Sequence, residues 1–361
     1  MNLLEQDYPY AITMWDYSWL ERRWPGAGFE DWDKALDELV ERGYDAVRID
    51  AYPHFIWKDP HKEWEIIPVR NQQDFGSPAR TRITVQNNLN DFIGKCAARN
   101  VKVALSTWWA IDVDNVVCDI KTPEDLAQAW MVTLDSIAEA GLLDNIIYID
   151  PSNEFPLKAW TPFLQDDLNR DRSSLEIQRW MKKTIEILKS HYPKLIYTFS
   201  EIPKSSWEEF DESYLDLFDP HIWMAGGEFY EKINYNYEKF DPVGYDNIAL
   251  YAEKLYRSDE DYWKELLISR INHAIQQSIS TGKLLATTES WAVIQYKDWP
   301  LLDWGWVKEL CELGTIKAAE SGKWVAICTS NFCAPQFRGM WRDVEWHKRL
   351  TKIIKNSRIK R

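Results

Sequence analysis

Short apolar segments alternate with longer amphipathic segments eight times along this chain. The apolar segments have the length of buried strands, and the amphipathic ones have the periodicity of helices. Such an alternation predicts parallel strands joined by helical crossovers. The predicted strands are residues 10–15, 45–50, 101–107, 146–149, 195–199, 217–223, 283–289 and 324–329. The main predicted helices are residues 29–42, 84–99, 122–141, 174–191, 206–214, 258–280, 304–321 and 343–354.

Eight strand–helix units in 361 residues predict closure into a (β/α)8 TIM barrel of the α/β class, with residues 1–361 as a single domain. An open, doubly wound sheet is the alternative, but no glycine-rich phosphate loop follows the first strand. A long segment at about 55–82 carries no strong pattern, and we expect it to be a loop at the barrel rim. The fold prediction is therefore a barrel with long βα rim loops.

Charge and composition exclude several kinds of partner. The net charge of −14 argues against nucleic acid and against an anionic membrane surface. The first residues lack the basic and apolar regions of a signal peptide, and no apolar run reaches the length of a membrane span. The five cysteines form no CxxC pair, which is typical of reduced thiols. We therefore expect a cytoplasmic protein, and the oligomeric state stays open.

Two predicted strands end in a glutamate. The first, residues 146–149, is followed by a break at Pro151 and then by Asn153 and Glu154. The second, residues 283–289, ends at Glu289. Active sites of (β/α)8 barrels lie where strands end and βα loops begin, so both carboxyl groups are expected at the barrel mouth.

A pair of opposed carboxyl groups is what glycosidic bond hydrolysis requires. One group protonates the leaving oxygen, and the other attacks the anomeric carbon or activates a water molecule. Strands four and seven lie on opposite sides of a barrel mouth, so Glu154 and Glu289 can face each other across a substrate. These two residues are the predicted catalytic pair.

The chain resembles the clan A glycoside hydrolases, which include the family 5 cellulases and mannanases, and is most similar to the cellulase-like group. The resemblance rests on Asn153-Glu154 after strand four, Glu289 after strand seven and Arg48 in the Val-Arg-Ile-Asp of strand two, and it extends from Trp15 to about Trp341. It implies that Glu154 is the acid/base, that Glu289 is the nucleophile and that Arg48 hydrogen-bonds Glu289. We expect the positive charge of Arg48 to keep Glu289 ionised. Arg48 could instead form a structural ion pair with Asp50 or with a helix.

Two positions depart from the family pattern. On strand six the family has His-x-Tyr, whereas this chain has His221-Ile222-Trp223. After strand eight the family has a Trp, and Asn331-Phe332 stands there instead. His221 is expected either to hydrogen-bond substrate or to fill the barrel interior. These departures leave the substrate class open.

Further strand-exit residues are candidates for lining a sugar pocket. The chain has 21 Trp residues, most of which are expected in the core, although an indole can also stack on a pyranose ring. The six histidines are scattered without a metal-binding spacing, so we expect no metal and no cofactor. The predicted substrate-binding residues are Asp16, Arg48, His54, Trp109, Asn153, Glu201, His221 and Trp291.

Two functional hypotheses follow from these residues. The first is a retaining glycoside hydrolase that cleaves a β-linked glycoside or short oligosaccharide by double displacement. The second is a barrel that binds sugar without turning it over, which the departures on strands six and eight make credible. Two opposed carboxyl groups favour the enzyme, because a protein that only binds sugar does not require them.

Overall fold

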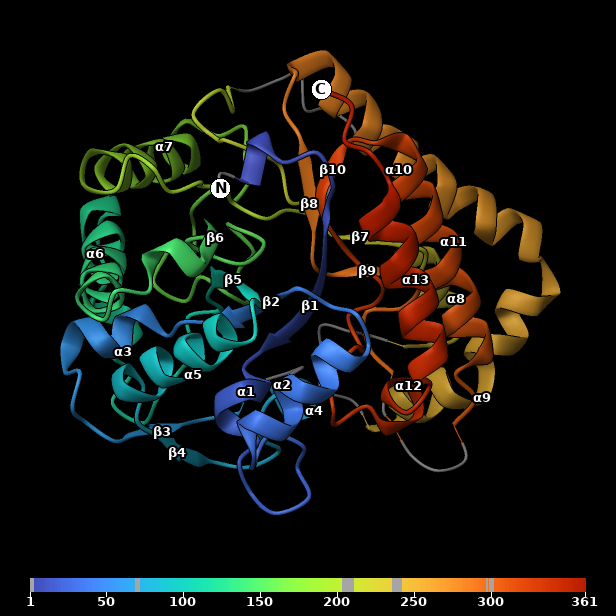
Figure 1. Cartoon of the computed structure of the whole chain (residues 1–361), viewed down its shortest axis with the longest axis horizontal. Helices are drawn as coiled ribbons and strands as arrows, with labels where there is room; N and C mark the ends of the chain where they lie inside the picture. Colours follow the sequence, from blue (N-terminus) through green and yellow to red (C-terminus); the bar gives the residue numbers. More distant parts are fainter. Residues whose placement is uncertain (1–2, 69–71, 203–210, 236–241, 297, 299–301) are drawn as a thin grey trace.

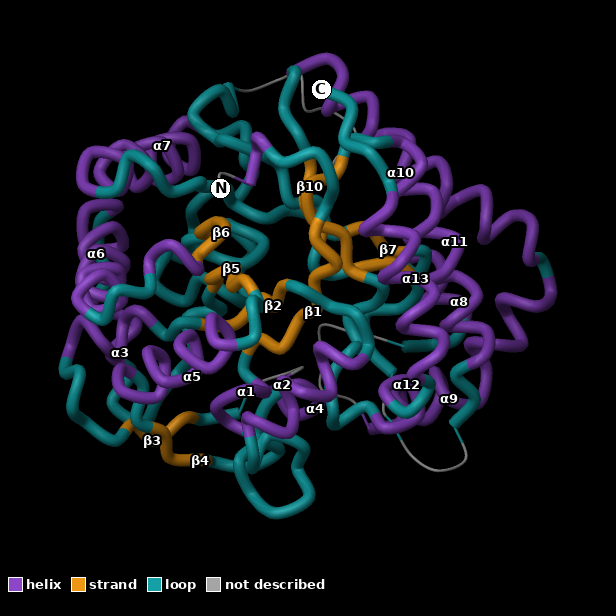
Figure 2. The backbone as a smooth tube through the Cα atoms, viewed as in Figure 1, coloured by secondary structure: helices purple, strands orange, loops and turns teal. Residues whose placement is uncertain are grey.

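A computed structural model of the chain describes residues 3–68, 72–202, 211–235, 242–296, 298 and 302–361. The strands gather in the interior and the helices surround them (Figure 1; Figure 2). The strands are β1 (Tyr10–Asp16), β2 (Ala46–Asp50), β3 (Trp64–Ile66), β4 (Thr81–Ile83), β5 (Lys102–Ser106), β6 (Ile146–Ile149), β7 (Ile222–Trp223), β8 (Leu285–Thr287), β9 (Ser290–Trp291) and β10 (Trp324–Cys328). The helices are α1 (Ser18–Glu21), α2 (Trp32–Glu41), α3 (Pro53–Lys58), α4 (Gln72–Phe75), α5 (Gln86–Ala98), α6 (Pro123–Glu139), α7 (Leu175–His191), α8 (Gly227–Lys232), α9 (Pro242–Ser258), α10 (Glu260–Thr281), α11 (Gly305–Ser321), α12 (Arg338–Trp341) and α13 (Val344–Asn356).

The barrel is built on a six-stranded parallel sheet in the order β6-β5-β2-β1-β10-β8. Two irregular segments close the ring between β6 and β8. Tyr197 bridges to Ile149 of β6, Glu201 bridges to Pro220, and Phe218 bridges to Leu285 of β8, all in parallel. The predicted TIM barrel is confirmed.

The fifth and sixth predicted strands, 195–199 and 217–223, were wrong as regular strands, because only single bridges and the two residues of β7 form there. A side-chain hydrogen bond and a proline interrupt the backbone hydrogen bonding between these segments and their neighbours. The backbone N–H of Tyr197 donates to the Asp216 carboxylate at 2.9 Å. This N–H is therefore not available for a hydrogen bond to a neighbouring strand. Pro220 has no N–H to offer. Both segments nevertheless occupy the barrel wall.

The segment 55–82 is not the loop that the sequence predicted. It contains the end of α3, the hairpin β3–β4 and, within it, α4. Trp64 pairs with Ile83 across the hairpin, and both side chains are buried, whereas Glu65 and Arg82 pair on the exposed side at 3.2 Å. A three-residue alternation is too short to stand out in the sequence.

Several helix ends follow the sequence signals. Thr122 and Asp125 form a reciprocal capping box at the start of α6, with Pro123 in the first turn. Gly282 and Gly322 end α10 and α11 at φ values of 71° and 70°, a region that glycine adopts without a steric penalty. The predicted helix 206–214 lies largely outside the described residues. Most tryptophans are buried, as expected for a core rich in aromatic residues.

Within the described ranges, no helix is long and apolar enough to span a lipid bilayer.

Candidate active site

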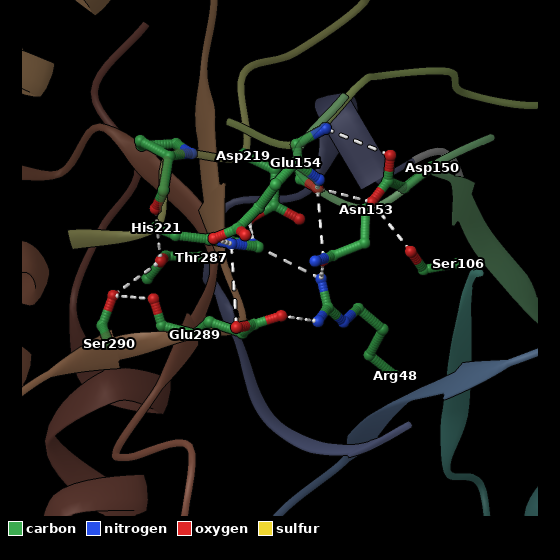
Figure 3. A network of polar contacts seen from close by, with 12 residues as sticks. Arg48, Ser106, Asp150, Asn153, Glu154, Asp219, His221, Thr287, Glu289 and Ser290 are labelled. Atoms are coloured by element: carbon green, nitrogen blue, oxygen red, sulfur yellow. Dashed lines mark hydrogen bonds and ion pairs between the residues drawn. The ribbon is translucent and has the colours of Figure 1, made fainter. Parts of the chain in front are cut away.

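Side chains from opposite sides of the barrel meet where the strands end. Arg48 comes from β2, Glu154 follows β6, His221 directly precedes β7, and Glu289 lies between β8 and β9 (Figure 3). One carboxylate oxygen of Glu154, one of Glu289 and a ring nitrogen of His221 all lie within 4.8 Å of one another. The two glutamate side chains keep 11% and 12% of their surface exposed, so both can be reached from the barrel mouth.

The Glu289 carboxylate is bound by Arg48. Nη2 of Arg48 donates to Oε1 of Glu289 and also to Oδ2 of Asp16 at 3.1 Å, while Nε donates to Oδ1 of Asp16 at 3.1 Å. The guanidinium lies 4.7 Å from the ring centre of Trp108, and its side chain has no exposed surface. Asp50 instead accepts the backbone N–H groups of Tyr52 and Trp108. Arg48 therefore pairs with Asp16 and Glu289 rather than with Asp50.

The Glu154 carboxylate is held by two donors. Nδ1 of His221 donates to Oε1 at 2.9 Å, and the indole N–H of Trp160 donates to Oε2 at 3.1 Å. The backbone N–H of Glu154 donates to the Ser200 hydroxyl at 2.9 Å. The carboxylate orientation is therefore fixed from both sides before any substrate arrives.

His221 lies at the centre of the charged groups. Its Nδ1 is 3.8 Å from Glu289, and its Nε2 is 4.0 Å from Asp219 and 3.3 Å from Nη1 of Arg48. Burial by itself lowers the pKa of His221, but the carboxylates of Glu289, Glu154 and Asp219 outweigh it and raise this pKa to about 9. The raised pKa favours the protonated form of His221 at neutral pH, and its Nδ1 faces both glutamates.

The pKa of Glu289 is shifted in the direction opposite to the one that Arg48 alone would give. Burial raises the pKa of Glu289, and the nearby positive charges of His221 and Arg48 oppose this rise without cancelling it. Arg48 favours the ionised form, as expected, but burial has the larger effect because the strand end is largely shielded from water. His221 is a second positive charge that favours the ionised form of Glu289.

Asn153 lies beside Arg48. Its Oδ1 accepts from Nη1 of Arg48 at 3.3 Å, whereas its buried Nδ2 has no hydrogen-bond partner among the described residues. An unsatisfied buried donor is costly unless a ligand completes it. Asn153 is therefore placed to donate to a polar group of a bound molecule.

The backbone is strained where the strands end at this site. Asp16, Tyr52, Trp109 and Glu154 all have positive φ values, of 28°, 46°, 53° and 45°. Residues other than glycine pay a steric cost there, and such residues cluster at functional sites. The strain turns the chain sharply at four strand ends around the barrel mouth.

Three predicted substrate-binding residues are core residues in this structure. His54 is fully buried with Nε2 on the carbonyl of Ala110, and burial lowers its pKa to about 3. Trp109 is 1% exposed, and Trp291 is 0% exposed with its indole N–H on the carbonyl of Cys328. The expectation that these two indoles stack on sugar is corrected, because neither presents an open face.

The Glu201 carboxylate belongs to a buried network with Arg172 and Glu212, while its carbonyl accepts the backbone N–H of His221 at 2.7 Å. Its carboxylate lies 3.6 Å from Nε of Arg172, which also binds Glu212 at 2.7 Å. Burial raises the pKa of Glu201 to about 7, opposed by Arg172 and reinforced by Glu212. Glu201 is 6% exposed, so it supports the barrel wall rather than offering a contact surface.

Trp108 and Trp160 contact Arg48 and Glu154, and neither was among the predicted site residues. Trp160 follows Glu154 by six residues, but in a chain with 21 tryptophans this spacing carries no signal. Asp16 was predicted to bind substrate; it is fully buried and binds Arg48 instead.

Glu154, His221 and Glu289 are close enough to ligate a metal ion. A guanidinium already occupies the cationic position beside Glu289, and both ring nitrogens of His221 already face partners, Nδ1 the Glu154 carboxylate and Nε2 the Arg48 guanidinium. This donor set therefore fits acid–base chemistry better than metal binding.

The chain is similar to proteins of one family. The model of the cellulase-like family, described as sugar-binding cellulase-like, matches residues 12–355. A crystal structure of a candidate glycoside hydrolase from Parabacteroides distasonis is 50% identical, covers 98% of this chain and 96% of its own, and superposes with a TM-score of 0.95. No curated protein matches this chain.

More distant structures share the fold. An endo-β-1,4-mannanase from Thermotoga petrophila is 10% identical, with a TM-score of 0.57 over 99% of this chain and 79% of its own. An endocellulase from Pyrococcus horikoshii, solved with cellotetraose, is 12% identical, with a TM-score of 0.54 over 94% and 92%. At these identities the likeness supports the barrel architecture.

Proposed function

This chain belongs to the cellulase-like family of clan A glycoside hydrolases, and we propose that it is a retaining enzyme that cleaves a β-linked glycoside or short oligosaccharide. One observation carries the proposal. The Glu154 and Glu289 carboxylates face each other with oxygens within 4.8 Å. Retaining enzymes hold their carboxyl groups about 5–5.5 Å apart, whereas inverting enzymes need about 6.5–9.5 Å to admit a water molecule.

In the first step Glu289 attacks the anomeric carbon. The bond from that carbon to the glycosidic oxygen breaks, and its electron pair goes to the leaving oxygen, which takes the proton of Glu154. Arg48 and His221 fit this role for Glu289, because both place positive charge beside a carboxylate whose pKa is raised by burial. The products are a glycosyl ester on Glu289 and an ionised Glu154.

In the second step water replaces the ester. The Glu154 carboxylate takes a proton from the water, the water oxygen bonds to the anomeric carbon, and the ester bond electrons return to Glu289. The donors on both oxygens of Glu154 hold its carboxylate in one orientation through both steps. Two inversions leave the anomeric configuration retained.

Activity and mechanism are tested with nitrophenyl glycosides of several sugars and both anomers at micromolar enzyme. We expect release from at least one β-glycoside. Glu289→Ala should abolish release, and azide should restore part of it as a glycosyl azide of the opposite anomer. Glu201→Ala is the matched control, since it removes another buried strand-end glutamate without touching Glu154 or Arg48. Full activity in Glu289→Ala would remove this residue from the mechanism.

A barrel that only binds sugar is the second candidate. Trp223 and the Asn331-Phe332 pair stand where the family pattern has Tyr and Trp, so the chain departs from the family pattern on strand six and after strand eight. Calorimetric binding of a sugar without release from any glycoside in the panel would favour this candidate over the enzyme.

A further inference from the structure

We propose that Trp160 is a positioning residue that hydrogen-bonds the Glu154 carboxylate through its indole N–H and thereby sets the upper pH limit of hydrolysis. This inference rests on the proposed function, since it assigns a role in the acid/base step. Trp160 is not one of the two proposed catalytic carboxylates and acts through its contact with Glu154.

The contact discriminates between the two charge states of Glu154. Trp160 reaches Oε2 at 3.1 Å, and His221 reaches Oε1 at 2.9 Å. Tryptophan can only donate, so its N–H is best used by an ionised oxygen. A carboxyl group that keeps its proton on Oε2 loses most of this interaction. The Trp160 N–H therefore interacts more strongly with an ionised carboxylate than with a protonated one.

The chain after β6 is folded so that this contact forms locally. The backbone N–H of Leu157 donates to the carbonyl of Glu154 at 2.8 Å, and the N–H of Trp160 donates to the carbonyl of Leu157 at 2.9 Å. The Thr161 hydroxyl also donates to the carbonyl of Leu157, at 3.0 Å. Two successive turns thus bring the indole back over the carboxylate six residues earlier.

The indole is also held from the other side of the site. The Trp160 and Trp108 rings meet edge to face at 6.5 Å and 85°, and Trp108 in turn lies under the Arg48 guanidinium. Trp160 is 6% exposed. The Trp108–Trp160 pair therefore contacts both sides of the site: Trp160 binds Glu154, and Trp108 packs against Arg48, which binds Glu289.

The other charged groups near Glu154 stay in place when Trp160 is changed. Among the described residues these are His221 and Glu289 directly, and Arg48 and Asp219 behind His221. None of these four accepts the Trp160 N–H, so a change at Trp160 reports on the indole contact alone.

The test is the pH profile of kcat/KM for Trp160→Phe on a glycoside with a poor leaving group. Phenylalanine keeps an aromatic ring at this position, although a smaller one, and removes the N–H. We expect the basic limb to move up by about one pH unit, because a hydrogen bond to a charged group has about that effect on its ionisation. For a dinitrophenyl glycoside, whose departure needs no proton, the glycosylation step should be unchanged.

Trp130→Phe is the matched control. Trp130 is fully buried, and its indole N–H donates to the carbonyl of Pro151 at 3.0 Å, in the same loop but away from the carboxylate. Loss of this N–H in Trp130→Phe should lower the midpoint of thermal unfolding. The basic limb of the pH profile should stay where it is in the wild type. A limb that moves equally in both variants would show a general loosening of the loop and would overturn the inference.

A second measurement does not depend on activity. In wild-type enzyme carrying ¹⁵N-labelled tryptophan, the Trp160 indole resonance, assigned by its loss in Trp160→Phe or Trp160→Tyr, should move with pH in step with the basic limb. In Glu154→Gln that movement should disappear. An indole resonance that is indifferent to pH, or an unshifted limb in an active Trp160→Phe enzyme, would refute the role of Trp160. Absence of hydrolysis by the wild type would instead refute the proposed function.

Discussion

His221 should make the stability of this protein depend on pH above neutrality. Its pKa is raised to about 9 in the folded state from an ordinary value of 6.5, since three carboxylates outweigh the effect of burial. A folded protein that binds a proton more tightly than the unfolded chain is stabilised by that proton. The contribution is therefore complete below about pH 6.5 and is lost as pH rises through about 9.

The size of the effect follows from the shift. The difference between about 9 and 6.5 is 2.5 units, which corresponds to about 3 kcal/mol at about 1.36 kcal/mol per unit. With 361 residues and about 2.1 cal/mol/K of unfolding entropy per residue, the unfolding entropy is about 0.76 kcal/mol/K. The midpoint of thermal unfolding should therefore fall by about 4 °C between pH 6.5 and 9.5 because of His221 alone.

The assay compares thermal unfolding of the wild type and His221→Gln across this pH range. The variant should be less stable than the wild type at pH 6.5. Between pH 6.5 and 9.5 its unfolding midpoint should fall by about 4 °C less than that of the wild type. His54→Gln is the control, because the pKa of His54 is lowered to about 3 and its effect on stability lies below pH 6.5. Equal alkaline slopes in wild type and His221→Gln would mean that His221 is neutral and accepts a hydrogen bond from Arg48 through Nε2.

Two further predictions concern packing and charge balance. Asp16→Asn removes the buried counter-charge of Arg48. The free energy of unfolding should therefore fall by about 3 kcal/mol, and kcat should fall as well. A melting curve like that of the wild type would show that Glu289 alone balances Arg48. Gly314→Ala in α11 places a Cβ 2.5 Å from the Trp291 ring, and denaturant unfolding should show a loss of about 1–3 kcal/mol. Gly94→Ala, in a helix position with no neighbour within 4 Å, should instead stabilise by about 0.5–1 kcal/mol; equal effects at both glycines would refute the packing argument.

The barrel could be predicted because its strands are apolar and its helices carry local signals. The capping residues of α6 and the glycines that end α10 and α11 act within one turn of the chain, so their effect can be read directly. The segment 195–199 could not be predicted in the same way. Its regular pairing is replaced by an Asp216 side chain that lies 19 residues further along, a contact that exists only after folding.

The positions of the strand-end residues could be predicted, but their surroundings could not. Topology alone brings Arg48, Glu154 and Glu289 to one mouth, because parallel strands end on the same side. Whether a side chain there faces the opening or the core depends on the backbone conformation at the strand exit, such as the φ of 53° at Trp109. Trp109 and Trp291 follow strand ends and yet point into the interior. Residue type and strand position therefore do not decide which aromatics can meet a ligand.

The charge state of Glu289 shows why the electrostatics of the site needed the structure. A single Arg48–Glu289 pair would lower the pKa of the glutamate, and this was the expectation from sequence. Arg48 is shared with Asp16, so much of its charge is already balanced. Burial then becomes the largest influence on Glu289, and the charge that offsets it most is that of His221. His221 was expected only to bind substrate or to fill the barrel interior, so this second positive charge beside the proposed nucleophile could not be predicted from the sequence.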